Sequence, residues 1–498
     1  MSSPATAAAH RWWALTALSV TTLMVALDAT VINIALPRAQ FDLHFSSANR
    51  QWLITAYVLA FGSLMLLGGR LSDLWGRRNA LYVGLVGFAL ASAVGGFAHS
   101  FAVLVSARAA QGVFGALLAP AALAALTTMF DDPRERAKAF SIYGAIAGSG
   151  AAIGLLLGGA LTQWSSWRWC LLINLFFAGL AILGVALFVP GARREHRTPL
   201  DVPGAVVGSG GLFFLVYGLG HAVTTSWSDG LTRGSLVIGA VLLALFTLLQ
   251  QRVASPVLPL RLLVNRVRGG SLLALFITNI GIFAVSLFLA YYLQSTIGYS
   301  PLKTGVAFLP MVGALALSAF IASARLLAMV GPRPLVPTGM LLGMLGMVLF
   351  TKLSPSANYL GHVLPGLVVT GLGLGLILAP AVASATAGIE KRDAGAASAL
   401  VNTTQQIGGS VGTALLNTIA VSVTVRAMSA LPAQLGSGSR AGVLARIHAT
   451  LHGYTVAFWW AAGFFGVGAV VTFALLESGV PELDDDLVPR GRQMRGQG

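Results

Sequence analysis

The feature that most constrains this chain is a series of long apolar runs separated by short charged segments. Fourteen runs of about 17 to 25 residues can be traced. A run of this length can cross a hydrocarbon layer of roughly 30 Å as a helix. The runs lie near residues 12–36, 51–70, 79–98, 102–124, 138–160, 169–189, 202–221, 235–250, 271–294, 304–328, 334–351, 361–385, 403–425 and 455–476.

The composition also fits a protein that lies in a lipid bilayer. The 498 residues are 56% hydrophobic and only 9% charged, whereas soluble domains have about 25% charged residues. Many of the 59 glycines lie within the apolar runs, where small residues let membrane helices pack closely. We therefore predict an all-α, polytopic membrane protein with fourteen transmembrane helices.

The positive charges are unevenly divided between the two sides of the predicted membrane. If the N-terminus is inside, the inner segments hold more than twice as many Lys and Arg residues as the outer segments. Because cytoplasmic loops carry such an excess, we expect both termini in the cytoplasm and the protein in the cytoplasmic (inner) membrane. The same bias accounts for the net charge of +15 without nucleic acid as a partner.

Several kinds of chemistry have no visible machinery in this sequence. There is no GxxxxGK[ST] phosphate loop and no His, Cys or Glu cluster with the spacing of a zinc site. Cys170 is the single cysteine, which excludes an intramolecular disulfide. We expect no metal, no organic cofactor and no enzymatic activity.

Two charged residues lie deep inside apolar runs. Asp28 occurs in VALDATVINIALP (25–37), and Arg108 lies within the fourth run. A central arginine costs about 2.5 to 3.5 kcal/mol by insertion scales, so such residues are usually kept for pairing or for function. We predict that Asp28 binds a proton and that Arg108, with Gln111 on the next turn, forms a proton-relay or structural element. The alternative for Arg108 is an anchor that satisfies helix carbonyls.

The stretch GGRLSDLWGRR, between the second and third runs, combines glycines with charges at fixed offsets. Its notable residues are Gly69, Asp73, Gly76, Arg77 and Arg78. The glycines permit a tight turn, and Asp73 can pair with an arginine one helical turn later. This combination resembles the cytoplasmic turn of the major facilitator superfamily, where it implies a latch on the inner face.

Other stretches resemble the fourteen-helix drug:proton antiporter branch of that superfamily. They are LDATVINIALP (27–37), RAAQG (108–112), SWRWCLLIN (166–174), YYLQSTIGYSPLKTGVAFLP (291–310) and NTTQQIGGSVGTAL (402–415). The resemblance covers about residues 12–476. It implies two six-helix bundles related by a pseudo-two-fold axis, each built from inverted three-helix repeats, with two helices inserted between them. It also links Arg108 to proton translocation.

This resemblance divides the chain into five parts. We expect a cytoplasmic tail at 1–11, an N-terminal bundle at 12–190, linkers with the two inserted helices at 191–268, a C-terminal bundle at 269–480 and a cytoplasmic tail at 481–498. The last part contains LVPRGR at 487–492. This is the sequence of a thrombin cleavage site and is typical of an added tag, so we set it aside.

The fifth run resembles the antiporter motif of the family through its small residues. Gly150, Gly154, Gly158 and Gly159 can form a close helix contact. The family has a glycine-proline step here, whereas this chain reads Gly154-Leu155, so a kink is not required. An ordinary small-residue interface and a special antiport hinge both fit this pattern.

The second half contains a partial copy of the charged turn and a set of polar residues. ASARLLAMVGPR (322–333) matches Gly76 with Gly331 and Arg78 with Arg333, but Ala328 replaces Asp73. Polar side chains could line a substrate cavity or form interhelical hydrogen bonds. These candidates are Asn33, Asn279, Tyr292, Asn402, Gln405 and Gln406.

These features lead to one main hypothesis and two alternatives. The main hypothesis is a monomeric, proton-coupled antiporter that exports amphipathic toxic compounds by alternating access and uses the proton motive force. Asp28 is the only acid near the middle of a run, which favours neutral or monocationic substrates. The alternatives are a proton-coupled transporter of one specific metabolite and a transporter-like receptor or structural membrane protein.

Overall fold

The computed structural model describes residues 4–46, 49–50, 52–130, 133–190, 201–253, 256, 265–387, 394–430 and 440–477. Within these residues, fourteen helices of 19 to 40 residues make up the fold. They are α1 (Pro4–Leu43), α2 (Trp52–Trp75), α3 (Arg77–Gly96), α4 (Phe101–Met129), α5 (Pro133–Trp164), α6 (Trp169–Phe188), α7 (Val202–Thr224), α8 (Gly230–Arg252), α10 (Arg266–Tyr291), α11 (Pro301–Ile321), α13 (Pro332–Phe350), α14 (Leu364–Thr386), α15 (Ala394–Ser429) and α16 (Arg440–Leu475). Four short elements are α12 (Leu327–Val330) and the π-helical turns η1 (Tyr292–Thr296), η2 (Ala322–Leu326) and η3 (Tyr359–Val363).

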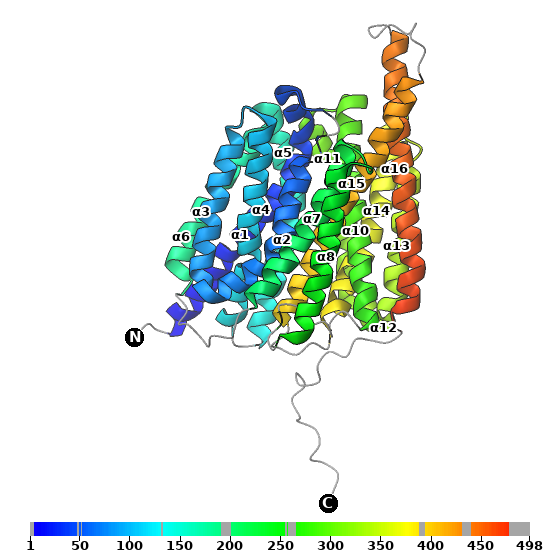
Figure 1. Ribbon diagram of the computed structural model, residues 1–498. Coiled ribbons are helices and arrows are strands. Elements are labelled where there is room, and N and C mark those ends of the chain that lie inside the picture. Colours follow the sequence, from blue (N-terminus) through cyan, green and yellow to red (C-terminus); the bar gives the residue numbers. More distant parts are fainter. Residues whose placement is uncertain are drawn as a thin grey trace, which may run out of the picture.

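The prediction of fourteen membrane-crossing helices is confirmed. Twelve of the described helical segments are long and apolar enough to span a membrane, and α2 and α5 contribute the shorter apolar stretches Trp52–Met65 and Ala152–Trp164. Figure 1 shows the helices running side by side, with α1 beginning and α16 ending at the same end of the molecule. We call this the inner end and the opposite one the outer end.

The helices form two six-helix bundles with the same internal arrangement. In the first bundle α1 packs on α5 and α6, α2 on α4, and α3 on α4 and α6; in the second, α10 packs on α15 and α16, α11 on α14, and α13 on α14 and α16. The contacts between the bundles, α5 with α11 and α2 with α15, are also paired. This correspondence is the pseudo-two-fold relationship that the family resemblance implied. The pair α7 and α8 lies outside it, and α7 contacts both α2 and α15.

Two glycines mark the same turn in both bundles. Gly76 precedes α3 with φ of 83°, and Gly331 precedes α13 with φ of 71°. Both values lie in the left-handed region, which glycine adopts without a steric penalty from a side chain. The match that the sequence predicted between these two turns therefore holds in the backbone.

The last two helices are longer than their apolar runs. α16 begins at Arg440, whereas its apolar run starts near residue 455. The added segment, RAGVLARIHATLHGY, is too polar for a membrane core but rich in the helix formers Ala, Leu and Arg. In Figure 1 the outer ends of α15 and α16 extend together beyond the other helices.

Hydrogen bonds join the two bundles near the outer end. Gln294 Nε2 donates to the carbonyl of Ile34 at 3.2 Å, and the backbone N–H of Leu302 donates to Gln163 Oε1 at 3.3 Å. Helix α5 also approaches the start of α11 closely. A Cβ built on Gly159 would lie only 2.7 Å from the Leu302 Cα. These contacts connect α1 and α5 of the first bundle with η1 and α11 of the second.

Candidate functional site

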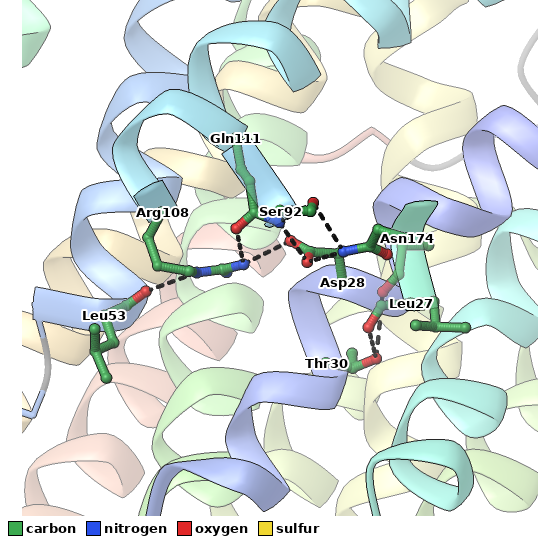
Figure 2. Close-up of polar contacts among 9 residues, drawn as sticks. Leu27, Asp28, Thr30, Leu53, Ser92, Arg108, Gln111 and Asn174 are labelled. Atoms are coloured by element: carbon green, nitrogen blue, oxygen red, sulfur yellow. Dashed lines mark hydrogen bonds and ion pairs between the residues drawn. The ribbon is translucent and has the colours of Figure 1, made fainter. Parts of the chain in front are cut away.

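Asp28 lies in the interior of the first bundle and is fully buried. Its Oδ2 is 2.6 Å from Nη1 of Arg108, and its Oδ1 accepts hydrogen bonds from Gln111 Nε2 at 2.9 Å and Asn174 Nδ2 at 2.7 Å. Figure 2 shows these side chains converging from α1, α4 and α6. A buried carboxylate with a charged partner and two further donors has the pairing that burial demands.

Arg108 connects three helices through its guanidinium group. Besides the ion pair with Asp28 on α1, its Nε donates to the backbone carbonyl of Leu53 on α2 at 3.1 Å. Its Cζ lies 4.4 Å from the ring centroid of Tyr57, also on α2. Nη1 additionally donates to Gln111 Oε1 at 2.9 Å. Only 1% of this side chain is exposed, so pairing and a cation–π contact replace its hydration.

Ser92 on α3 completes the network. Its Oγ lies 2.7 Å from Gln111 Nε2 and 3.3 Å from Asn174 Nδ2. The hydroxyl can therefore accept from the same two amide groups that donate to Asp28 (Figure 2). Five of the six helices of the first bundle thus meet at one polar centre.

This centre fits an ionised carboxylate. The two amide nitrogens and the guanidinium are all donors, and a carboxylate is an acceptor only. A proton on Asp28 would remove the counter-charge of Arg108 and turn one acceptor oxygen into a donor that faces other donors. Protonation at this place therefore requires the surrounding side chains to rearrange.

The glycines of α5 pack against the part of α1 that carries Asp28. A Cβ built on Gly150 would lie 2.7 Å from Ala26 Cβ, and one on Gly158 would lie 2.9 Å from the carbonyl oxygen of Val31. A Cβ built on Gly154 would lie closer still to Thr30 Oγ1. Because nothing larger than hydrogen fits, α1 and α5 approach along their backbones, and the kink of the family motif is not needed for this contact.

The residues of the predicted latch lie at the inner end. Gly69 faces Pro120, and Arg78 donates to the Ala186 carbonyl near the end of α6 at 2.8 Å. Such a carbonyl belongs to the negative end of a helix dipole, which favours a cation. Arg77 takes part in a contact of its own, and the side chain of Asp73 lies outside the described residues. The latch function stays a prediction.

The six candidate cavity residues have different surroundings. Asn33 is buried, Asn279 donates to the Leu275 carbonyl of its own helix at 2.9 Å, and Gln406 lies against Gly62 of the first bundle. Asn402 is exposed and Gln405 is partly exposed on the same helix.

Tyr292 differs from these candidates. It is fully buried, and its hydroxyl donates to the Ser354 carbonyl at 2.8 Å. This bond accounts for Tyr292 as an anchor within the second bundle. Whether the other candidates bind substrate stays a prediction.

Sequence reasoning missed four partners in the polar centre. Ser92 and Asn174 are single polar residues in otherwise apolar runs, which was the available signal, but such residues most often make ordinary interhelical bonds. Tyr57 resembles any buried aromatic residue. The acceptor at Leu53 is a backbone carbonyl and leaves no trace in the sequence.

Comparisons with known proteins agree with this architecture. Residues 18–413 match the Major Facilitator Superfamily model. The puromycin resistance protein of Streptomyces alboniger is 46% identical over 478 residues, which are 96% of this chain and 93% of that protein. The cephamycin export protein of Amycolatopsis lactamdurans is 38% identical over 418 residues, which are 83% of this chain and 85% of that protein.

A solved structure shares the fold. It is a bacterial homologue of the human lysosomal transporter Spinster in an inward-facing, unoccupied conformation. The TM-score is 0.66 at 17% identity, over 95% of this chain and 98% of that chain. Together with the sequence matches, the paired bundles identify this chain as a multi-pass membrane transporter of the major facilitator superfamily.

Proposed function

We propose that this transporter is a proton-coupled antiporter that exports amphipathic toxic compounds, such as antibiotics, by alternating access. The buried pair of Asp28 and Arg108 is the observation that carries the proposal, since it offers a proton site inside a transport bundle. The resistance and export functions in the names of the relatives support the substrate class. Neutral drugs and lipophilic monocations fit best, because in the sequence Asp28 is the only acid near the middle of an apolar run.

The polar centre suggests how a proton changes the bundle. When Asp28 takes a proton, Arg108 loses its counter-charge on α1 but keeps its bonds to α2 through Leu53 and Tyr57. Protonation thus loosens α1 from α4 and leaves α4 attached to α2. Because α2 contacts α15 of the second bundle, a shift of α2 can change how the bundles meet.

The energy that one proton supplies is comparable to the cost of opening the buried ion pair. Removing one partner of a buried ion pair costs about 3 to 5 kcal/mol. A proton that enters down a potential of 100 mV supplies about 2.3 kcal/mol, and a gradient of one pH unit adds about 1.4 kcal/mol. One proton therefore supplies roughly what is needed to open the pair, with the proton motive force as the energy source.

Orientation and assembly are part of the proposal. The excess of basic residues in the segments at the inner end supports a cytoplasmic location for that end and for both termini. The bacterial relatives support the cytoplasmic membrane. A functional monomer is also part of the proposal.

Efflux from proteoliposomes tests the proposal. Purified wild type should export a fluorescent amphipathic drug when a pH gradient is imposed, and a protonophore should abolish the export. Asp28→Asn should lose this gradient-driven export. Asp229→Asn is the matched control, because Asp229 caps α8 and Asn caps helices about as well as Asp. Export that persists in Asp28→Asn, or that ignores the gradient in wild type, would refute proton coupling through Asp28.

A further inference from the structure

A cavity of about 730 Å³ lies between the two bundles at the outer end. Its walls come from the end of α1, the residues before α2, the junction of α10 and η1, and the extended parts of α15 and α16. The lining is mainly apolar and aromatic, with rings from Phe41, Phe45, Tyr291 and Tyr454. This volume and lining are typical of a pocket for a drug-sized molecule.

Arg50 gives this cavity its charge. Its side chain lines the cavity, although only 4% of the residue is exposed. Nε and Nη2 donate to Asn417 Oδ1 at 3.3 and 3.1 Å, and Cζ lies 4.2 Å from the ring centroid of Tyr291 and 6.0 Å from that of Tyr454. These partners lie on α15, α10 and α16 of the second bundle, and all of them are neutral.

Arg108 and Arg50 therefore differ in one respect. Arg108 is paired with the carboxylate of Asp28, whereas none of the described residues that line the cavity around Arg50 carries a carboxylate. The nearest acid in sequence, Asp42, accepts from Trp167 Nε1 at 2.9 Å and lies 3.8 Å from Arg168. A buried cation without a counter-ion is costly, and an anion from solution would relieve that cost.

We propose that the outer cavity binds amphipathic anions, with an aromatic body against the apolar walls and the anionic group on the guanidinium of Arg50. Such an anion competes with Asn417 for the two N–H donors of Arg50. Binding would then weaken a contact that joins the first bundle to α15. A lipophilic cation would be repelled at the same place, so the site selects by the sign of the charge.

The inference goes beyond the proposed export function, because the anions it concerns differ in charge from the neutral and monocationic substrates of that proposal. Its test measures equilibrium binding and needs no transport, so the two proposals can fail separately. The probes are 8-anilinonaphthalene-1-sulfonate and N-phenyl-1-naphthylamine, which differ only by the sulfonate. Their fluorescence is titrated with purified protein in nanodiscs of zwitterionic lipid, and the signal of empty nanodiscs is subtracted.

Charge variants test the role of the guanidinium. Arg50→Gln should weaken binding of the sulfonate probe at least tenfold and leave the uncharged probe within about twofold. Arg50→Lys should keep part of the preference for the sulfonate. Arg446→Gln is the control, because Arg446 is an exposed arginine of α16 that does not line the cavity.

Steric variants test the cavity without touching Arg50. Val421→Trp fills the wall and should weaken both probes at least tenfold. Val443→Trp should weaken neither, because Val443 is exposed on the same pair of extended helices and outside the lining. These variants decide the question if Arg50→Gln does not fold. Unchanged sulfonate binding in Val421→Trp, or an equal loss of both probes in folded Arg50→Gln, would overturn the proposal.

Discussion

Replacing Arg108 by Met is the sharpest probe of the polar centre. Met keeps much of the length and volume of the side chain but cannot pair with Asp28. The variant leaves a buried carboxylate without its cation, which typically costs about 3 to 5 kcal/mol. Because Oδ1 of Asp28 keeps the amide donors of Gln111 and Asn174 at 2.9 and 2.7 Å, we expect the lower end, about 3 kcal/mol.

The reverse change, Asp28→Asn, should cost a similar amount. Arg108 then keeps the Leu53 carbonyl, the Gln111 amide oxygen and the face of Tyr57, but no counter-charge. In the double variant neither charge remains unpaired. A hydrogen bond to a charged group is worth about 1.5 to 3 kcal/mol, so the two changes should couple by about 2 kcal/mol. The double variant should then lose about 4 kcal/mol instead of about 6.

The free energy of unfolding is measured for the four proteins by titration with sodium dodecyl sulfate in mixed micelles. Arg446→Met serves as a control, because this arginine is exposed and its loss should change stability by less than about 0.5 kcal/mol. Losses that add within about 0.5 kcal/mol would show that the two residues act independently. That result would refute the ion pair as the element that joins α1 to α4.

Three further changes probe other contacts. Asn174→Leu removes a donor to the Asp28 carboxylate and should lower the free energy of unfolding by about 1.5 to 3 kcal/mol. Its control, Asn279→Leu, loses only a bond to its own helix and should cost less than about 1 kcal/mol. Equal losses in the two variants would contradict the assigned contact. Gly154→Ala should lower the free energy of unfolding by about 1 to 3 kcal/mol, because the added methyl group forces α1 away from α5. Its control is Gly179→Ala, where a Cβ meets nothing within 4 Å. This control should be neutral or stabilising in the same unfolding titration. Gly76→Ala should cost about 1 to 2 kcal/mol because its φ is 83°, and a thermal unfolding midpoint equal to that of wild type would show that the turn relaxes freely.

The helices could be predicted from the sequence, because bilayer thickness sets the length of a spanning helix and hydropathy shows which residues form one. Each helix is therefore predictable independently of the others. Each of the fourteen apolar runs became a long helix. Three of these helices are joined to π-helical turns, η1 near 271–294, η2 with α12 near 304–328 and η3 near 361–385. The repeated glycine turn was readable because a left-handed φ strongly favours one residue type. The extra length of α16 was not predicted, since its polar extension is held by helix propensity and by packing on α15, which hydropathy does not measure.

The polar centre was only half predictable. Two charges in apolar runs are conspicuous, so Asp28 and Arg108 were found, with Gln111 through its spacing from Arg108. Their meeting at 2.6 Å depends on how α1 and α4 cross, which no local pattern encodes. Asn174 was hidden for the same reason: a lone amide becomes a ligand of the carboxylate only through the position of α6. The roles of these residues in transport stay predictions until the variants are measured.

The bond from Arg108 to the carbonyl of Leu53 has a genetic consequence. A peptide carbonyl is supplied by every amino acid, so no single substitution at position 53 deletes this acceptor. A mutational scan should therefore tolerate at this position any side chain that fits the buried packing, and the attachment of α4 to α2 should survive in all of them. Loss-of-coupling mutations should accumulate instead at Asp28 and Arg108, whose side chains have no such redundancy. The hydrogen bond that joins the polar centre to α2 therefore depends on the backbone of residue 53 and not on its side chain.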